Sequence, residues 1–194
     1  MKLTRLLAMA IIPAVLCCAA FGDPVTLVNG GSSVTLSYQT SFPNPDGTAT
    51  FTLSGDTLTV VIENTSTDPN TRITGIGFDT TPDVTISDLS GTLEAAGWTL
   101  AGGGGVGNFE VTVGDPGNCA GGALCPGDSG TLIFTLEGFS GDLTIDTSVM
   151  HFQALPDESS EKPTGTPIPE PASMVLLGTG MVGAAKLVRR RMSR

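Results

Sequence analysis

The sequence predicts an all-β fold, an antiparallel β-sandwich, and three observations support this prediction. Short runs in which apolar residues alternate with polar ones recur along the chain, as expected for strands with one buried face. Clusters of Gly, Pro, Asn and Asp separate these runs and provide turns. The 26 glycines and 13 prolines among the 194 residues also disfavour long helices. A jelly roll is one version of this sandwich, and a β-solenoid is the alternative, although the chain has no fixed repeat period.

Each expected strand is justified by its own alternation. In the first run Val34, Leu36 and Tyr38 are apolar and the residues between them are polar. The same period of two continues through residues 49–53, 58–63, 109–113, 131–137 and 143–146. Turn signals separate these runs at residues 44–47, 54–56, 68–70 and 115–117, at Gly138 and at Gly141. We therefore expect about eight to ten short strands, and no helical segment, in an ectodomain that covers residues 23–154.

Charge is segregated along the chain. The net charge is −10, and 18 acidic residues lie between positions 23 and 168 against only two basic ones, Arg72 and Lys162. The other basic residues lie at the two ends. This distribution predicts an acidic body with membrane-targeting ends, and it argues against a nucleic-acid partner, which requires a basic surface.

The N-terminal 22 residues predict a secretory signal peptide helix. Lys2 and Arg5 precede an apolar run at 6–16, and the small residues that follow fit cleavage after Ala20 or Gly22. The apolar run is shorter than the roughly 20 residues that span a bilayer, which argues against the alternative of a retained anchor. A lipoprotein signal is a further alternative, but the small residue that normally precedes the lipidated cysteine is missing.

The C-terminal 26 residues have three parts, which are Pro169-Glu170-Pro171, an apolar stretch at 172–188, and the cluster Arg189, Arg190 and Arg191. The prolines keep their segment out of a regular helix, so a transmembrane helix is expected to begin after them. Its 17 residues would span about 25 Å. The arginines are expected to stay in the cytoplasm by the positive-inside rule, which leaves the body outside.

These three parts, in this order and spacing, resemble the PEP-CTERM sorting signal of exported proteins from Gram-negative bacteria that make exopolysaccharide. The resemblance implies that an exosortase, a membrane-embedded transpeptidase-like enzyme, recognises and removes the tail. It also implies transient anchoring in the inner membrane, followed by release to the cell surface or extracellular matrix. A plain single-pass anchor is the alternative. The segment 73–79 and the sequence Met150-His-Phe-Gln153 weakly resemble other tail-bearing ectodomains, and this likeness implies no activity.

Residues 155–168 are polar and rich in proline, and they have no apolar periodicity. This composition predicts a linker between the ectodomain and the sorting signal. Upstream of it, Cys119 and Cys125 remain after signal cleavage and lie six positions apart without a nearby histidine. An oxidising compartment favours a disulfide between them, and the spacing does not fit a zinc site.

The remaining candidate sites are weak, and no cofactor is expected. The formal G-x-G-x-x-G at Gly102, Gly104 and Gly107 precedes an expected strand rather than a phosphate-binding helix. His151 is the only histidine and has no nucleophile beside it in the sequence. The acids Asp79, Asp83 and Asp88 could ligate calcium, but they form no known loop pattern.

The function expected from the sequence is that of a non-enzymatic structural or matrix protein, associated with exopolysaccharide. Aromatic residues are few, and Trp98 and Tyr38 are the candidates for stacking on sugars beyond phenylalanine. The alternatives are a glycan-active enzyme that uses two carboxylates and a calcium-dependent adhesin. Ranked threonines such as Thr48 and Thr50 also suggest an ice-binding face, although threonine is common in strands for its β propensity alone.

Overall fold

The computed structural model describes residues 24–31, 33–44, 46–101, 109–114 and 119–168. Twelve strands are found in this part of the chain. They are β1 (Val25–Leu27), β2 (Val34–Gln39), β3 (Asp46–Ser54), β4 (Thr57–Asn64), β5 (Arg72–Thr81), β6 (Ile86–Ser90), β7 (Thr99–Leu100), β8 (Phe109–Thr112), β9 (Ser129–Leu136), β10 (Leu143–Gln153), β11 (Ser160–Glu161) and β12 (Thr166–Pro167). A short helix α1 (Thr92–Ala95) and a 3-10 turn η1 (Cys119–Gly121) complete the list.

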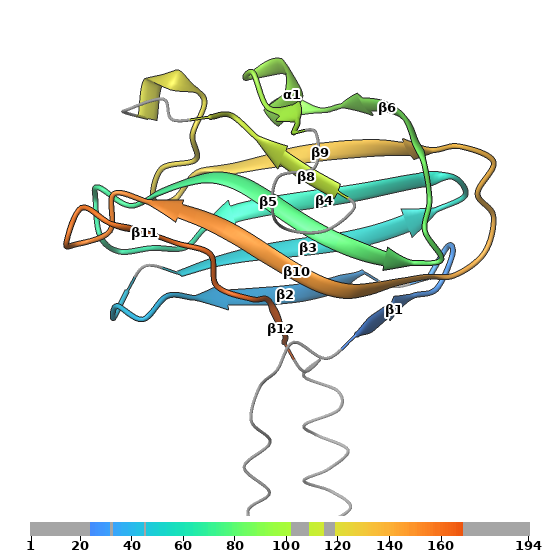
Figure 1. Cartoon of the computed structure of the whole chain (residues 1–194), viewed down its shortest axis with the longest axis horizontal. Coiled ribbons are helices and arrows are strands. Elements are labelled where there is room, and N and C mark those ends of the chain that lie inside the picture. The colour runs from blue at the N-terminus through green and yellow to red at the C-terminus, as the bar shows by residue number, and fades with distance from the viewer. Residues whose placement is uncertain (1–23, 32, 45, 102–108, 115–118, 169–194) are drawn as a thin grey trace, which may run out of the picture.

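The strands form two six-stranded antiparallel sheets that pack face to face (Figure 1). Sheet A has the order β1-β10-β5-β8-β7, and β11 adds to β10. Sheet B has the order β12-β2-β3-β4-β9-β6. Strands β2, β3 and β4 form a meander, after which most connections cross between the sheets. The predicted all-β antiparallel fold is therefore confirmed.

The core lies between the two sheets and contains a cluster of phenylalanines. Phe78 of β5 stacks on Phe109 of β8 with the ring centroids 4.9 Å apart. Phe51 of β3 and Phe134 of β9 meet Phe78 edge-on from the opposite sheet, at 5.4 and 5.6 Å. All four rings are buried. Edge-to-face pairs of this kind add to the stabilisation from burial, so they join the sheets at the centre of the sandwich.

The strand β5 was not predicted from alternation, although it is central in sheet A. Gly75 and Gly77 occupy positions on it where an apolar–polar pattern would show larger side chains, and seven of its ten residues are buried, six of them in an unbroken run. A strand covered on both faces does not alternate in polarity, so period-two reasoning does not detect it.

The body contains a helical turn, so the prediction of no helical segment is wrong. The helix α1 is one turn long, and its Leu93 is buried. Gly91 before it has φ 118°, and a Cβ at this glycine would lie 2.3 Å from the Thr131 carbonyl oxygen. The hydroxyl of Thr92 accepts a hydrogen bond from the Thr131 amide at 2.8 Å. A single turn is too short to show a helical period, so sequence reasoning could not find it.

Residues 155–168 are also not the predicted linker. This segment, called the C-terminal strap below, contains β11 and β12 and pairs with both sheets. Its composition is polar because it runs along the surface, but its backbone is hydrogen-bonded to the body. Composition alone does not reveal such bonds, because the backbone N–H and C=O groups can pair with a sheet edge whatever side chains the segment has.

The predicted signal peptide at 1–22 and the predicted transmembrane helix at 172–188 lie outside the described residues. Within the described ranges, no helix has the length and apolar character needed to cross a bilayer.

Candidate functional site

The C-terminal strap closes one side of the sandwich by running from sheet A to sheet B (Figure 1). At its start β11 pairs with the end of β10, through Phe152 opposite Glu161. Thr164 then forms a bridge with Val149 of β10. At its end β12 pairs with β2 at the edge of sheet B. The strap therefore joins the free edges of the two sheets immediately before the C-terminal tail.

Gly165, near the end of the strap, is buried and fixes the strap to the body. Its amide donates to the Ser148 carbonyl oxygen at 2.8 Å. A Cβ at this glycine would lie 2.8 Å from two carbons of the Tyr38 ring, so only glycine fits against the tyrosine. The Tyr38 hydroxyl is hydrogen-bonded to the Ser148 hydroxyl at 2.6 Å. The Ser148 hydroxyl also donates to the Gly77 carbonyl oxygen. Burial raises the pKa of Tyr38 well above its ordinary value.

Two charged side chains hold the first half of the strap. Glu161 accepts hydrogen bonds from the amide and the hydroxyl of Ser41, which follows β2. The Lys162 ammonium group lies 3.8 Å from a carboxylate oxygen of Glu110 on β8. Lys162, Glu110 and Gly75 line one small cavity, so this ion pair spans the glycine-bearing strand β5. The pair is partly exposed to solvent and is expected to contribute less than about 1 kcal/mol.

A tight turn begins the strap. Leu155 is buried, and its amide donates to the Ser159 carbonyl oxygen at 3.2 Å. Hydrogen bonds from the Ser159 hydroxyl and amide lower the pKa of the exposed Asp157 below its ordinary value. The buried leucine and this turn set the direction in which the strap leaves β10.

The last residues of the strap are hydrogen-bonded to β2. Thr166 lies opposite Ser37, and the Ile168 amide donates to the Thr35 carbonyl oxygen at 3.0 Å. Because hydrogen-bonded and non-hydrogen-bonded pairs alternate in an antiparallel ladder, Pro167 falls at a non-hydrogen-bonded position. Its missing N–H therefore costs no ladder bond, and the proline is tolerated at the edge. Pro167 and Ile168 are both exposed.

A match to a known family begins at this end of the strap. A family model for the PEP-CTERM protein-sorting motif matches residues 167–191. The chain carries a PEP-CTERM protein-sorting motif. The motif supports export of the protein and processing by an exosortase. No curated protein and no solved structure matches this chain.

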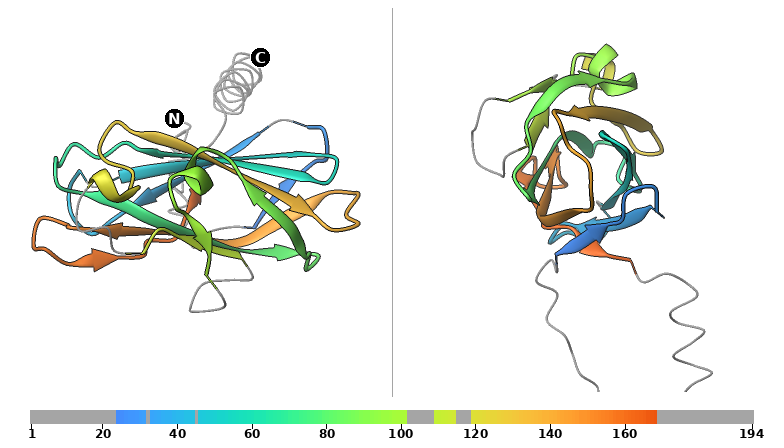
Figure 2. Two further views of the ribbon diagram at one scale, coloured as in Figure 1. Left: turned by 90° about the horizontal axis from the view of Figure 1, so that it is seen from above. Right: turned by 90° about the vertical axis from the view of Figure 1, so that its right-hand side faces the viewer.

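The predicted sorting residues all lie within the matched stretch, which covers Pro169, Glu170, Pro171, Arg189, Arg190 and Arg191. These residues are outside the described part of the chain, and the structure assigns them no geometry. The structure does show that the motif starts in a folded part of the chain. The strands β1 and β12 lie on the same side of the sandwich (Figures 1 and 2).

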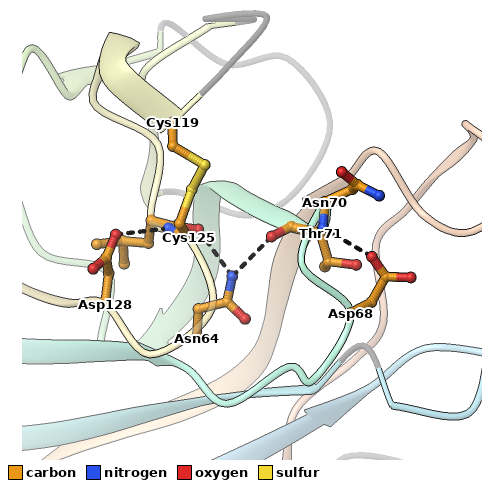
Figure 3. Close-up of a disulfide and its surroundings, with 8 residues drawn as sticks. Asn64, Asp68, Asn70, Thr71, Cys119, Cys125 and Asp128 are labelled. Carbon is orange, nitrogen blue, oxygen red and sulfur yellow. Dashed lines mark hydrogen bonds between the residues drawn. A yellow bond between two sulfur atoms is a disulfide. The ribbon is translucent and has the colours of Figure 1, made fainter.

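Cys119 and Cys125 form a disulfide in the structure, and their Cα atoms are 5.8 Å apart (Figure 3). The Asp128 carboxylate accepts a hydrogen bond from the Cys125 amide at 3.1 Å. The Asn64 side chain lies beneath the loop and donates to the Leu124 and Thr71 carbonyl oxygens at 2.9 and 3.2 Å. The pair is thus part of a structural loop joined to the end of β4.

Asn64 is also the first residue of a formal glycosylation sequence, Asn-Thr-Ser. Its side chain is fully buried, and its side-chain oxygen Oδ1 accepts a hydrogen bond from the Ser66 amide at 3.0 Å. An amide with both ends occupied inside the protein is a structural residue and is not accessible for modification.

The other sequence candidates do not converge on a site. His151 lies on β10, with its Nδ1 3.2 Å from the Thr74 hydroxyl. Trp98 is fully buried and donates to the Gly122 carbonyl oxygen at 2.8 Å. Tyr38 is equally buried, so neither ring is available to stack on a sugar. Gly102, Gly104 and Gly107 lie outside the described ranges, and β8 follows them, as expected.

The acids proposed for calcium are not brought together. Asp79 is on β5, Asp83 is in the loop that follows, and Asp88 is on β6. Within the described ranges, no three His, Cys, Asp or Glu side chains form a group that could hold a metal ion.

The residues that sequence reasoning missed are those of the strap, above all Gly165, Thr166 and Ile168. The only sequence signal for Gly165 is a lone glycine among threonines and prolines, which reads equally well as a linker.

Proposed function

We propose that this PEP-CTERM protein is a non-enzymatic structural or matrix component of the cell surface, associated with exopolysaccharide. In this proposal the inner membrane holds the precursor through the C-terminal helix, and exosortase processing then releases the ectodomain to the surface or matrix. The observation that supports polysaccharide association is the outer face of sheet B, which presents hydroxyl groups in rows across neighbouring strands.

The rows follow from strand register. One row contains Ser37, Thr48, Glu63 and Ser129, the next Thr35, Thr50, Val61 and Thr131, and a third Thr52, Thr59 and Ile133. Some of these hydroxyls are fixed by hydrogen bonds. The Thr35 and Thr50 hydroxyls are 2.9 Å apart, and the Thr52 hydroxyl donates to Ser33 at 2.8 Å.

A hydroxyl is both a donor and an acceptor, so such a face can exchange hydrogen bonds with the hydroxyls of a polysaccharide. Each bond contributes only about 0.5–1.5 kcal/mol, because it replaces bonds to water. A polymer with many repeats can make several such contacts at once, and the effective concentration of the later contacts then raises the overall affinity. A broad polar face suits this mode of weak, repeated binding.

The test uses processed protein recovered from the cell surface and the exopolysaccharide of the same cells. Co-sedimentation measures the bound fraction. The variant T35V/T50V removes one hydrogen-bonded hydroxyl pair from the outer face of sheet B. The matched control T26V/T144V removes another such pair, which joins β1 to β10 in sheet A.

We expect T35V/T50V to weaken binding by about 5- to 150-fold, because two hydroxyls at about 0.5–1.5 kcal/mol each are lost. The control is expected to bind as the wild type does. Equal binding by all three proteins would refute the role of this face, and no binding by the wild type would refute polysaccharide association.

The alternative of a glycan-active enzyme has one specific observation in its favour. Asp68, Arg72 and Glu158 line an open groove beside the disulfide loop. Asp68 also accepts a hydrogen bond from the Asn70 amide at 2.9 Å, which is a structural use of this carboxylate. Hydrolysis of the exopolysaccharide by wild type but not by D68N or E158Q would favour the enzyme.

A further inference from the structure

The sorting motif and the folded body share residues. The family match begins at Pro167, and Pro167 belongs to β12. Ile168, the second matched residue, is hydrogen-bonded through its amide to Thr35 of β2. The motif therefore does not follow a free linker but starts inside an edge strand of sheet B.

We propose that residues 166–168 have two roles. In the free protein they are the edge strand of sheet B, and during processing they are the upstream part of the segment that the exosortase binds. Binding then requires these residues to separate from β2. This inference rests on exosortase processing and is independent of polysaccharide association.

The physical reason is competition for the same backbone groups. Enzymes and other proteins that bind extended peptides commonly do so through main-chain hydrogen bonds, as in addition of a strand to a sheet. The Ile168 amide already donates to Thr35, and β12 is already paired with β2. An enzyme that binds the chain just upstream of Pro169 must therefore replace these bonds.

The exposure of these residues makes the replacement feasible. Pro167 is exposed, and the Ile168 side chain is 47% exposed, so separation from β2 uncovers little apolar surface of their own. Pro167 contributes no N–H, and Thr166 adds one long side-chain hydrogen bond, 3.3 Å to the Ser37 carbonyl oxygen. The strand is thus held mainly by main-chain bonds that an enzyme can supply in turn.

The separation is expected to stop at Gly165. This residue is buried, donates to Ser148 at 2.8 Å and packs against the Tyr38 ring. Upstream of it, Glu161 and Lys162 are tied to Ser41 and Glu110. Release of the three residues that follow Gly165 provides about 10 Å of extended chain. The body can therefore stay folded while the enzyme holds the motif.

The test is a disulfide that locks β12 onto β2. Ser37 and Thr166 are directly opposite each other in an antiparallel hydrogen-bonded pair, for which a Cα separation of about 5.5 Å is typical. This separation lies within the range for disulfides. The variant S37C/T166C is expressed as the full chain in cells that contain the exosortase, and intact mass measures the processed fraction.

We expect the locked variant to show at least a tenfold lower processed fraction than the single variants S37C and T166C. Addition of a reductant should restore processing. Wild type given the same reductant controls for reduction of the native Cys119–Cys125 disulfide.

A second variant separates release from misfolding. Three residues, Thr-Pro-Ile, are inserted after Ile168 in S37C/T166C, so that a second copy of the upstream segment lies beyond the lock. We expect this variant to be processed as well as the wild type. Processing of S37C/T166C at the wild-type level would overturn the proposal, and so would failure of the inserted variant. Failure of the wild type itself would instead refute exosortase processing.

Discussion

Removal of the buried hydrogen bond between Tyr38 and Ser148 tests the closure of the sandwich most directly. The two hydroxyls are 2.6 Å apart, and Tyr38 is fully buried. The substitutions Y38F and S148A remove the same bond but leave different groups behind. In Y38F the Ser148 hydroxyl keeps its bond to the Gly77 carbonyl oxygen, at 3.2 Å. In S148A the buried tyrosine hydroxyl loses the partner that it has in the described part of the chain.

These differences set the magnitudes. Y38F is expected to lower the free energy of unfolding by about 0.5–1.5 kcal/mol, the net value of one hydrogen bond. S148A is expected to lower it by about 1–3 kcal/mol, because a buried hydroxyl is left unsatisfied. The double variant should be no less stable than S148A, since it has no stranded hydroxyl. The expected changes in melting temperature are about 2–4 °C per kcal/mol.

The same residue predicts a pH dependence. Burial raises the pKa of Tyr38 in the folded protein above its ordinary value, which is about 10. Above this value the unfolded chain loses the proton and the folded chain keeps it. The contribution of Tyr38 to the free energy of unfolding is therefore fully present below about pH 10. It falls as the pH rises further, by at most about 1.4 kcal/mol per pH unit. Y38F should lack this part of the decrease.

The assay is denaturant unfolding between pH 7 and about pH 11. The chain has one tryptophan and one tyrosine, so fluorescence of Trp98 reports unfolding and tyrosinate absorbance reports Tyr38 alone. Two results would refute the reasoning. One is Y38F being more destabilising than S148A, and the other is tyrosinate absorbance that appears near pH 10 while Trp98 still reports a folded protein.

Three further predictions follow from the tail, the disulfide and the strap. Replacement of residues 169–171 by alanines should leave a membrane-held precursor, and intact mass would show whether processing continues unchanged, which would contradict the sorting signal. Cys119→Ser should lower the free energy of unfolding by about 2 kcal/mol, the loop-closure value for a short loop. Two free thiols at Cys119 and Cys125 in the exported protein would contradict the pairing. Gly165→Ala should destabilise the body by about 1–3 kcal/mol, because its Cβ would clash with the Tyr38 ring, and an unchanged unfolding curve would contradict that contact.

The alternating strands are the part of the fold that local sequence predicted well. The runs at 34–39, 49–53 and 58–63 became β2, β3 and β4, because each has one buried and one solvated face. Gly55, in the expected turn at 54–56, has φ 65° between β3 and β4. Such signals are local, so they can be recognised in a single sequence without knowledge of what packs against the strands.

The strands that were missed owe their conformation to neighbours distant in sequence. β5 is covered on both faces and shows no alternation, and β11 and β12 exist only because edges of β10 and β2 are there to bond them. The likeness of residues 73–79 to other ectodomains marked part of β5 but did not identify it as a strand. Pairings across so many residues leave no local pattern.

The sequence alone determined the motif that directs this protein to an exosortase, because residue types and their order within one short stretch define that signal. It also determined the acidic, all-β character of the body. Only the tertiary structure decided that Tyr38 and Trp98 are core residues and that the strap closes the sandwich. It also decided that the sorting motif begins within a paired strand. Burial and strand pairing depend on which distant segments meet, and that is a property of the folded chain as a whole.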